Sequence, residues 1–531
     1  MIAEALAIQQ AVDWRAVLAE SRDLLMPEVI LTLFACAALV LDVILPRERH
    51  RWTAYATLFG TLLAAVSLAS LWSAQGDALP RLGFYRMIVV DDFALVFKVI
   101  FLVGLAISIA LSLRYLDLES EQRGEFYALM AFATAGMMLM ASGYDLLSLY
   151  IALELMALSV YVLVGFLKRN RESNEASMKY FLLGAFSSGV LLYGFSLLYG
   201  LTGSMNLADI AEAIPALVET GAVGLLIVAM VLVAAGMLFK VAAAPFHMWA
   251  PDAYEGAPTP VTAFMSVGVK AASFALFARL FLEGIPGLRS IGDPYDGGLP
   301  GWALLLGVVA ALTMTWGNIG AITQKNAKRL LAYSAISHAG FLLLGLVAGN
   351  ETGYTGLVIY LIVYLAMNLG AFGVVVALKR KGLEGDRLED FEGLARRAPW
   401  LAGLMTIFLL SLGGIPPTAG FIGKLYLFYG LLETGDPWLA RLALLAVLNT
   451  AVSVYYYLLF VKAMYMTEPA EDAPDVRTDA GIRAALVVTA ALTLLVGIFP
   501  QPAIAVSKRA VDRFRPAAWS PKQPPEPERT E

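Results

Sequence analysis

Charged residues and cysteine are scarce in this sequence, and each scarcity excludes a class of protein. Asp, Glu, Lys and Arg make up 15% of the 531 residues, whereas soluble proteins carry about one quarter. A single cysteine, Cys36, excludes an intrachain disulfide and a thiolate-held iron–sulfur cluster. Of three histidines, His50 lies in a predicted loop. A bis-histidine haem would need His247 and His338, and nothing else in the sequence indicates a haem pocket.

Nucleotide-binding motifs are missing as well. No Gly-rich loop follows a predicted strand, and no Walker lysine motif is present, so we do not expect ATP to drive this chain alone. No pattern is typical of a nicotinamide, flavin or iron–sulfur site. We therefore expect no cofactor and no metal in this chain.

Hydrophobic residues are abundant instead, at 59%, with a mean hydropathy of +0.72. They occur in runs of roughly twenty, the length that crosses a bilayer as a helix. Because backbone polar groups must be satisfied inside the segment in lipid, the sequence predicts an all-α polytopic membrane protein. We expect about fourteen spans, at 24–45, 53–74, 92–113, 125–142, 145–167, 178–201, 221–246, 260–282, 301–320, 329–348, 354–378, 400–431, 440–466 and 482–504.

The segments outside the spans are short. Segment 79–91 is too short to span and alternates apolar and aromatic residues, which suits a small hairpin or an interfacial stretch. Residues 1–22 form an N-terminal extension, and the Pro-rich, charged segment 505–531 is predicted as a tail. The membrane domain is predicted over 24–504.

Basic residues alternate between the loops. Loops 1, 3, 5, 9 and 11 are basic, whereas even-numbered loops carry Arg81, Arg86, Arg289 and almost nothing else. The thirteenth loop (467–481) is acidic and departs mildly from this pattern. The positive-inside rule therefore predicts odd loops in the cytoplasm and both termini on the periplasmic side of a bacterial inner membrane.

Two spans are predicted to be broken. Residues 221–250 would be about 45 Å long as a straight helix and contain Ala-Pro-Phe at 244–246. Residues 400–431 contain Gly-Gly-Ile-Pro-Pro at 413–417. Proline removes a helical hydrogen bond, and paired broken helices indicate an inverted-repeat transporter. Spans seven and twelve are five apart, so spans 4–8 (about 123–283) and 9–13 (about 301–467) are predicted as two inverted five-helix repeats.

Four ionisable residues interrupt apolar segments: Glu154, Lys240, Lys270 and Lys424. A charge in hydrocarbon costs about 2.5–3.5 kcal/mol on insertion scales, and such residues mark ion or proton paths. A buried ammonium can switch between holding and releasing a proton when a nearby carboxylate moves. A row of lysines suits protons, because a loaded ammonium repels Na⁺. We therefore predict a proton relay.

Other interpretations stay open for individual residues. Glu154 could be a neutral buried carboxyl, or a carboxylate held by Lys179 at the start of span six. Lys179 and Lys240 could instead snorkel to the membrane surface. His247 follows Lys240 by seven residues and would share its face on an unbroken helix, and His338 lies inside span ten. Each histidine is either a proton carrier or a satisfied core residue.

Three stretches resemble a known family. FKVAAAPFHMWAPDAYEGAPTPVTAFMSVGVKAASFALFARL (239–280), YSAISHAGF (333–341) and SLGGIPPTAGFIGKLYLF (411–428) resemble the antiporter-like membrane subunits of respiratory complex I. The resemblance extends over all fourteen predicted spans. Lys424, where subunit M would carry a glutamate, and the PDAYEGAPTPV segment favour the N type.

The resemblance implies a proton-translocating module with a central axis of charged residues. By position, Glu154 matches a glutamate that communicates between neighbouring subunits and Lys179 its partner. Lys240 matches the lysine beside the break of span seven, Lys270 the connecting lysine, and Lys424 the lysine that exchanges protons with the outer side. His247 and His338 match polar positions along this axis.

The resemblance also implies neighbours. Subunit M is expected on one side and subunits K, J and A on the other, with FMN, iron–sulfur clusters and quinone in other subunits of the complex. Rival functions are the equivalent subunit of a photosynthetic ferredoxin-linked complex and a subunit of a multi-subunit Na⁺/H⁺ antiporter. A free-standing solute permease is less compatible, because no ligand-tailored polar site is evident.

Overall fold

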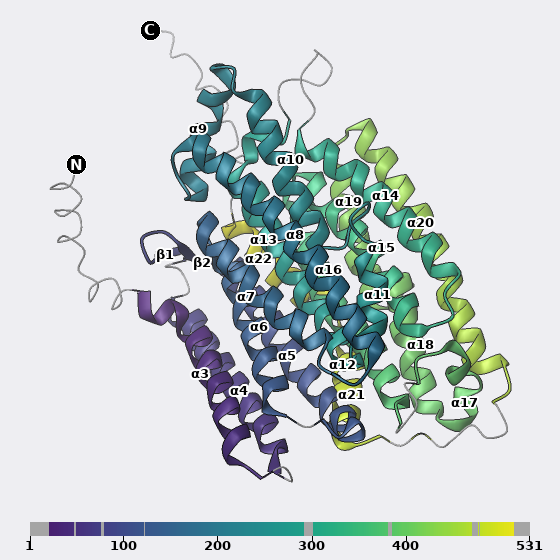
Figure 1. Cartoon of the computed structure of the whole chain (residues 1–531). Coiled ribbons are helices and arrows are strands. Elements are labelled where there is room, and N and C mark those ends of the chain that lie inside the picture. Colours follow the sequence, from purple (N-terminus) through teal and green to yellow (C-terminus); the bar gives the residue numbers. More distant parts are fainter. Residues whose placement is uncertain are drawn as a thin grey trace, which may run out of the picture.

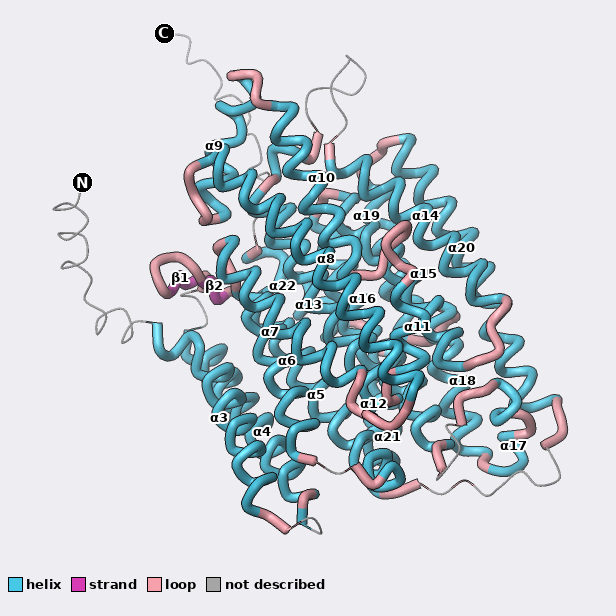
Figure 2. The backbone as a smooth tube through the Cα atoms, in the orientation of Figure 1, coloured by secondary structure: helices cyan, strands magenta, loops and turns pink. Residues whose placement is uncertain are grey.

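The described residues of this computed structural model form a bundle of long helices with a small hairpin at its edge (Figures 1 and 2). They are residues 21–514 except 47–48, 76–78, 122, 291–300, 381–384, 470–475 and 477. Strands β1 (Arg81–Gly83) and β2 (Ile88–Val90) pair antiparallel. The predicted all-α fold is confirmed, and so is the hairpin at 79–91.

Thirteen of the described helices are long and apolar enough to cross a membrane. Twelve of them contain one α-helix each. The first of these twelve begins as the 3₁₀ turn η1 (Arg22–Leu25) and continues as α3. In order, these are α3 (Met26–Ile44), α4 (Arg51–Gln75), α5 (Asp92–Glu119), α6 (Gly124–Ser142), α7 (Leu146–Val164), α8 (Arg171–Thr202), α10 (Val223–Lys240), α14 (Trp302–Ile322), α15 (Ala327–Ala348), α16 (Glu351–Leu378), α20 (Pro437–Met466) and α21 (Ala480–Ile498).

The thirteenth, span eight, is a composite helix of four segments. It joins α12 (Thr259–Phe264), the π-helical η3 (Met265–Val269), α13 (Lys270–Ala278) and the π-helical η4 (Arg279–Gly284). Shorter elements complete the fold: α9 (Leu207–Glu219), α11 (Trp249–Gly256), η5 (Pro286–Leu288), η6 (Leu388–Phe391), α17 (Leu394–Arg397), α18 (Pro399–Gly413), α19 (Ala419–Glu433) and α22 (Gln501–Arg513).

Predicted span twelve is not among these thirteen helices, because it is divided into the shorter helices α18 and α19. Gly414 follows α18 with φ +76°, and Pro416 and Pro417 stand in the gap before α19 begins at Ala419. A left-handed residue ends a helix and proline cannot continue it, so the sequence itself dictates the break. The predicted break is confirmed.

Predicted span seven ends earlier than 246. Helix α10 stops at Lys240, Ala242 has φ 57°, and the chain restarts as α11 at Trp249. Pro245 lies in the turn between the two helices, where its missing N–H costs no helical bond. Lys240 therefore stands at the break itself.

Polar caps mark the starts of several other helices. Asp91, Asp145, Asn170, Asn326 and Asn350 each accept a backbone N–H at the start of α5, α7, α8, α15 and α16. Such caps satisfy backbone donors that the helix leaves free.

The predicted ends of the chain are only partly described. Residues 1–20 of the N-terminal extension and residues 515–531 of the tail lie outside the described residues. The start of the predicted tail, from residue 505, is not a loop but continues α22 to Arg513. It packs against α5 and α16.

Span eight and α16 form the centre of the bundle. Nearly every residue of both is buried. Asn368 of α16 donates to Ser266 Oγ of η3 at 2.6 Å, and Asn318 of α14 donates to Asn449 Oδ1 of α20 at 3.0 Å. Asn368 and Asn449 therefore each take part in a hydrogen bond between two helices.

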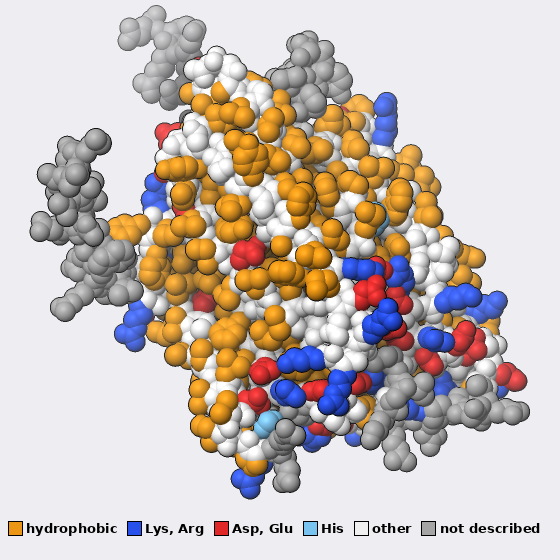
Figure 3. Space-filling view, viewed as in Figure 1, with side chains coloured by type: hydrophobic (Ala, Val, Ile, Leu, Met, Phe, Trp, Pro, Cys, Tyr) orange, Lys and Arg blue, Asp and Glu red, His pale blue; other side chains and the backbone are white. Residues whose placement is uncertain are grey.

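The surface of the bundle that Figure 3 shows is hydrophobic along most of its length and charged at one end. Figure 3 shows a broad hydrophobic band over this face and a cluster of Lys, Arg, Asp and Glu at its lower end. We call this lower end, which carries the odd-numbered loops, the basic end. The opposite end, which carries β1, β2 and α9, is the hairpin end.

Two fully buried cations near the hairpin end are paired with carboxylates. Arg279 donates to Asp91 Oδ1 at 2.7 Å and to the Glu283 oxygens at 3.0 and 3.1 Å. Lys98 lies 2.7 Å from Glu28 Oε1, with 0% of its side chain exposed. Glu28 therefore supplies Lys98 with a partner inside the bundle.

The Arg279 cluster predicts a large stability effect. Arg279→Met should destabilise the protein by about 3–5 kcal/mol, because it leaves two buried carboxylates without their cation. Arg51→Met is the control: Arg51 pairs with Asp117 while 57% of its side chain is exposed, and an exposed pair contributes about 1 kcal/mol at most. The measurement is thermal unfolding of the detergent-purified protein. Equal losses in both variants would contradict this account of the cluster.

Candidate functional site

Lys240 lies at the break of span seven and points into the bundle. Its residue is 4% exposed. The ammonium donates to Ser188 Oγ of α8 at 3.0 Å and to Tyr161 Oη of α7 at 3.3 Å. Two neutral hydroxyls thus solvate this charge. Snorkelling, which the sequence left open for Lys240, is excluded.

Glu154 lies on α7 near Lys240. Its Oε1 atom is buried and has no hydrogen-bond partner among the described residues. The carboxylate acts electrostatically on Lys240 and on Tyr161. The charge of Glu154 therefore acts on Lys240 without an ion pair between them.

Lys179 does not pair with Glu154, contrary to the predicted pairing. Its ammonium contacts Glu175 Oε1 and Asp252 Oδ2, each at 2.8 Å, and 43% of its side chain is exposed. Glu175 precedes it by one helical turn on α8, and α11 packs directly against α8. Lys179 therefore pairs with these nearer carboxylates, close to the basic end.

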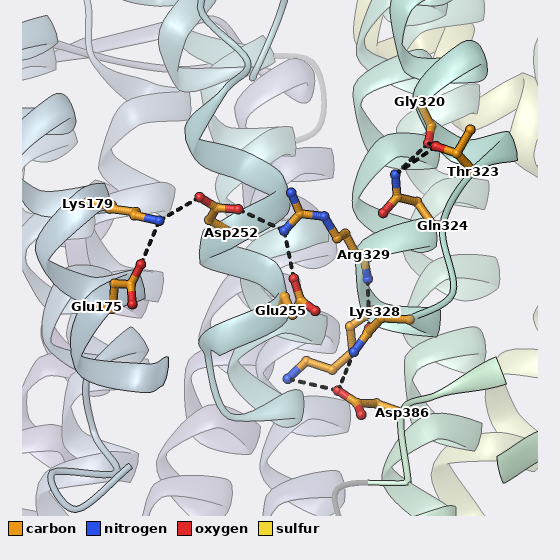
Figure 4. Close-up of polar contacts among 11 residues, drawn as sticks. Glu175, Lys179, Asp252, Glu255, Gly320, Thr323, Gln324, Lys328, Arg329 and Asp386 are labelled. Carbon is orange, nitrogen blue, oxygen red and sulfur yellow. Dashed lines mark hydrogen bonds and ion pairs between the residues drawn. The ribbon is translucent and has the colours of Figure 1, made fainter. Parts of the chain in front are cut away.

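Asp252 extends this contact into a network that reaches the second half of the chain (Figure 4). Arg329 of α15 donates to Asp252 Oδ1 at 2.8 Å and to Glu255 Oε2 at 2.7 Å. Burial of Asp252 opposes its ionisation, but the hydrogen bonds from Lys179 and Arg329 outweigh burial and lower the pKa of this carboxyl. This network was not predicted from the sequence, although the PDAYEG motif contains both acids.

Lys270 lies where η3 meets α13, in the middle of span eight. It is 3% exposed, and its ammonium donates to the backbone oxygen of Ala335 on α15. Span eight belongs to the first predicted repeat and α15 to the second. Lys270 therefore connects the two halves of the bundle.

His338 stands one turn further along α15. Its Nδ1 lies 2.6 Å from Tyr360 Oη of α16, and its Nε2 lies 3.3 Å from Tyr457 Oη of α20. Both Lys270 and Lys424 act on this imidazole electrostatically. His338 thus lies between two of the predicted lysines. The tyrosines were missed, although a phenol within an apolar span signals a polar contact.

Lys424 lies on α19, just past the break of span twelve. It is 2% exposed, and it donates to the backbone oxygens of Leu412 at 3.0 Å and Gly413 at 3.3 Å. These carbonyls end α18, so the negative end of a helix dipole holds the charge. Gly414 lets the backbone approach, since a Cβ there would lie 2.9 Å from Lys424 Cδ. The break therefore builds the binding site of this lysine.

His247 lies in the turn after α10 and does not share a helix face with Lys240. The seven-residue spacing predicted a common face only for an unbroken helix, and α10 ends at Lys240. The residue is 6% exposed, and its Nδ1 has no hydrogen-bond partner among the described residues. Its ring contacts Trp316 with centroids 5.7 Å apart.

The described residues contain no group of three or more His, Cys, Asp or Glu side chains that could hold a metal ion. Among them, Lys240, Lys270 and Lys424 have no carboxylate within ion-pair distance. Each lysine is held by hydroxyl or carbonyl oxygens. Such an arrangement can bind and release protons, and it resembles no substrate pocket.

Comparisons with known proteins agree with this arrangement. A family model described as "NADH:quinone oxidoreductase/Mrp antiporter, TM" matches residues 143–450. NADH-quinone oxidoreductase subunit N 2 of Solibacter usitatus is 47% identical over 497 residues, which are 92% of this chain and 97% of that protein.

Solved structures share the fold. A chain of respiratory complex I from Thermus thermophilus with bound aureothin is 35% identical, with a TM-score of 0.73 over 90% of this chain and 98% of that one. A chain of the Mrp complex from Dietzia sp. has a TM-score of 0.75 over 93% of this chain and 98% of its own. At 24% identity, that likeness shows the fold alone.

The family match and the high identity over nearly the whole chain decide among the candidate functions. They confirm the resemblance inferred from the sequence motifs. The chain belongs to the NADH-quinone oxidoreductase subunit N family, the antiporter-like, proton-translocating membrane subunits of respiratory complex I.

Proposed function

We propose that protons move along a row formed by Glu154, Lys240, Lys270, His338 and Lys424. The observation that carries the proposal is the burial of three lysines whose contacts are neutral oxygens. An ammonium locked to a carboxylate loses that Coulomb attraction when it gives up its proton, whereas one held by hydroxyls and carbonyls loses less. These lysines are therefore suited to exchange.

The two ends of the row have different roles in this proposal. Glu154 senses the state of a neighbouring subunit and acts on Lys240, which can pass a proton toward Lys270. Lys424, held by the carbonyls of a broken helix, exchanges protons with the periplasmic side. Lys179 supplies charge near the cytoplasmic end of the row, and His247 supports it beside the break of span seven.

The resemblance to complex I supports a wider assignment. We propose that the chain lies in a bacterial inner membrane with both termini on the periplasmic side, which makes the basic end cytoplasmic. Subunit M would lie on one side and subunits K, J and A on the other. FMN, iron–sulfur clusters and quinone would reside in other subunits, whose redox reaction drives this chain.

The internal symmetry belongs to the same proposal. Two inverted five-helix repeats would span about residues 123–283 and 301–467, each with one broken helix. Lys240 ends the helix before one break, and Lys424 lies in the helix after the other. A buried lysine beside each break supports the assignment. The first half would then load protons and the second would release them.

Removing the central lysines tests the proton path. Lys270→Ala and Lys424→Ala should each lower proton pumping and coupled quinone reduction by about tenfold or more, because a proton-transferring group is lost. NADH oxidation with an artificial acceptor should continue, since that reaction bypasses the membrane subunits. Coupled quinone reduction and NADH oxidation with the artificial acceptor are measured on the purified complex. Proton pumping is measured in liposomes.

Lys168→Ala serves as the control for the lysine variants, because Lys168 is exposed on the loop before α8. It should pump at the normal rate. Near-normal pumping by both Lys270→Ala and Lys424→Ala, in complexes of normal subunit composition, would refute the proposed row.

The single cysteine allows a direct test of orientation. In a Cys36→Ser background, Thr220→Cys at the hairpin end should react with a membrane-impermeant maleimide from the periplasmic side. Lys168→Cys at the basic end should react only after the inner membrane is opened. Both residues are exposed. The reverse labelling pattern would overturn the orientation.

A further inference from the structure

The tyrosine hydroxyls on both sides of His338 fix the state of its imidazole. Tyr360 and Tyr457 come from different helices, and each is almost fully buried. Tyr457 Oη also lies 2.5 Å from Ser334 Oγ, one turn before His338 on α15. The imidazole is thus the middle of a hydrogen-bonded series that runs from Tyr360 through Tyr457 to Ser334.

The direction of this series follows from counting acceptors. The described residues offer the Tyr360 hydroxyl one acceptor, Nδ1 of His338. Tyr360 therefore donates to Nδ1, and the neutral ring carries its proton on Nε2. That N–H then donates to Tyr457 Oη, which also shares a hydrogen bond with Ser334 Oγ. The opposite direction would leave the Tyr360 hydrogen without an acceptor among these residues.

We infer that Tyr360 and Tyr457 are positioning residues for proton transfer through His338. They hold the neutral ring as the Nε2–H tautomer, with that proton directed at Tyr457. When the ring takes a second proton on Nδ1, the Tyr360 hydroxyl turns and its oxygen accepts the new N–H. The charged groups that face the ring are Lys270 from span eight and Lys424 from α19, and either can supply that proton.

This inference rests on the proposed proton row and adds two members that the sequence did not indicate. It predicts a specific sign for the variants. A hydrogen bond from a charged donor is about twice as strong as one between neutral groups, so losing either oxygen disfavours the imidazolium more than the neutral ring. His338 then loads a proton only at lower pH.

The test uses Tyr360→Phe and Tyr457→Phe in the whole complex. Each should slow coupled quinone reduction and pumping about tenfold at neutral pH, the factor for one hydrogen bond to a charged group. Each should also move the pH profile of both activities toward lower pH. A role in packing alone would leave that profile in place, because phenylalanine keeps the ring.

Tyr364→Phe is the matched control. Tyr364 lies one turn further on α16 and is as buried, but its hydroxyl has no hydrogen-bond partner among the described residues. It should keep its rate and pH profile. Unchanged profiles in Tyr360→Phe and Tyr457→Phe, or equal effects in all three variants, would overturn the inference. Lys270→Ala and Lys424→Ala in the same assay separate the outcomes, since normal pumping there would defeat the proton row itself.

Discussion

The structure depends on how a positive charge is held inside a bundle that excludes bulk water. An unsolvated ammonium there would cost several kcal/mol, so each one needs oxygen atoms within reach. Lys240, Lys270 and Lys424 obtain them from hydroxyls and backbone carbonyls, without a carboxylate among the described residues. The two helix breaks serve this need directly. A helix that ends inside the bundle frees carbonyls, as α18 does for Lys424, and a helix that ends at Lys240 lets its side chain reach α7 and α8.

Buried charge in this protein divides into two kinds. Arg279 and Lys98 sit against carboxylates near the hairpin end and tie together helices distant in sequence. Their protons are fixed by strong pairing, which suits a structural role. The lysines of the central row are held more weakly and lie near groups that can change state, Glu154 and His338. This contrast, rather than burial alone, separates the proposed proton carriers from the structural ion pairs.

Much of this could be predicted from the sequence, because the membrane imposes simple rules. Spans of about twenty residues, the proline-containing breaks and the hairpin followed from composition and turn chemistry. Lysines within apolar runs could be recognised as candidate site residues, because a charge in hydrocarbon is costly. Pairing could not be predicted, since it depends on which distant helices meet. Lys179 lies nearer to Asp252 than to a partner on α7, Lys98 meets Glu28, and the end of α10 at Lys240 separates His247 from the face expected for it. Tyr360 and Tyr457 were missed because a tyrosine in an apolar span has no periodic signature.

The central claim is that the lysines, His338 and their hydroxyl partners form one hydrated path across the middle of the bundle. The most direct measurement is an electron cryo-microscopy map of the whole complex at a resolution that reveals ordered water. The account predicts water molecules bridging Lys240 to Lys270 and Lys270 through His338 to Lys424, with each ammonium turned inward. Dry apolar packing between these groups would contradict it.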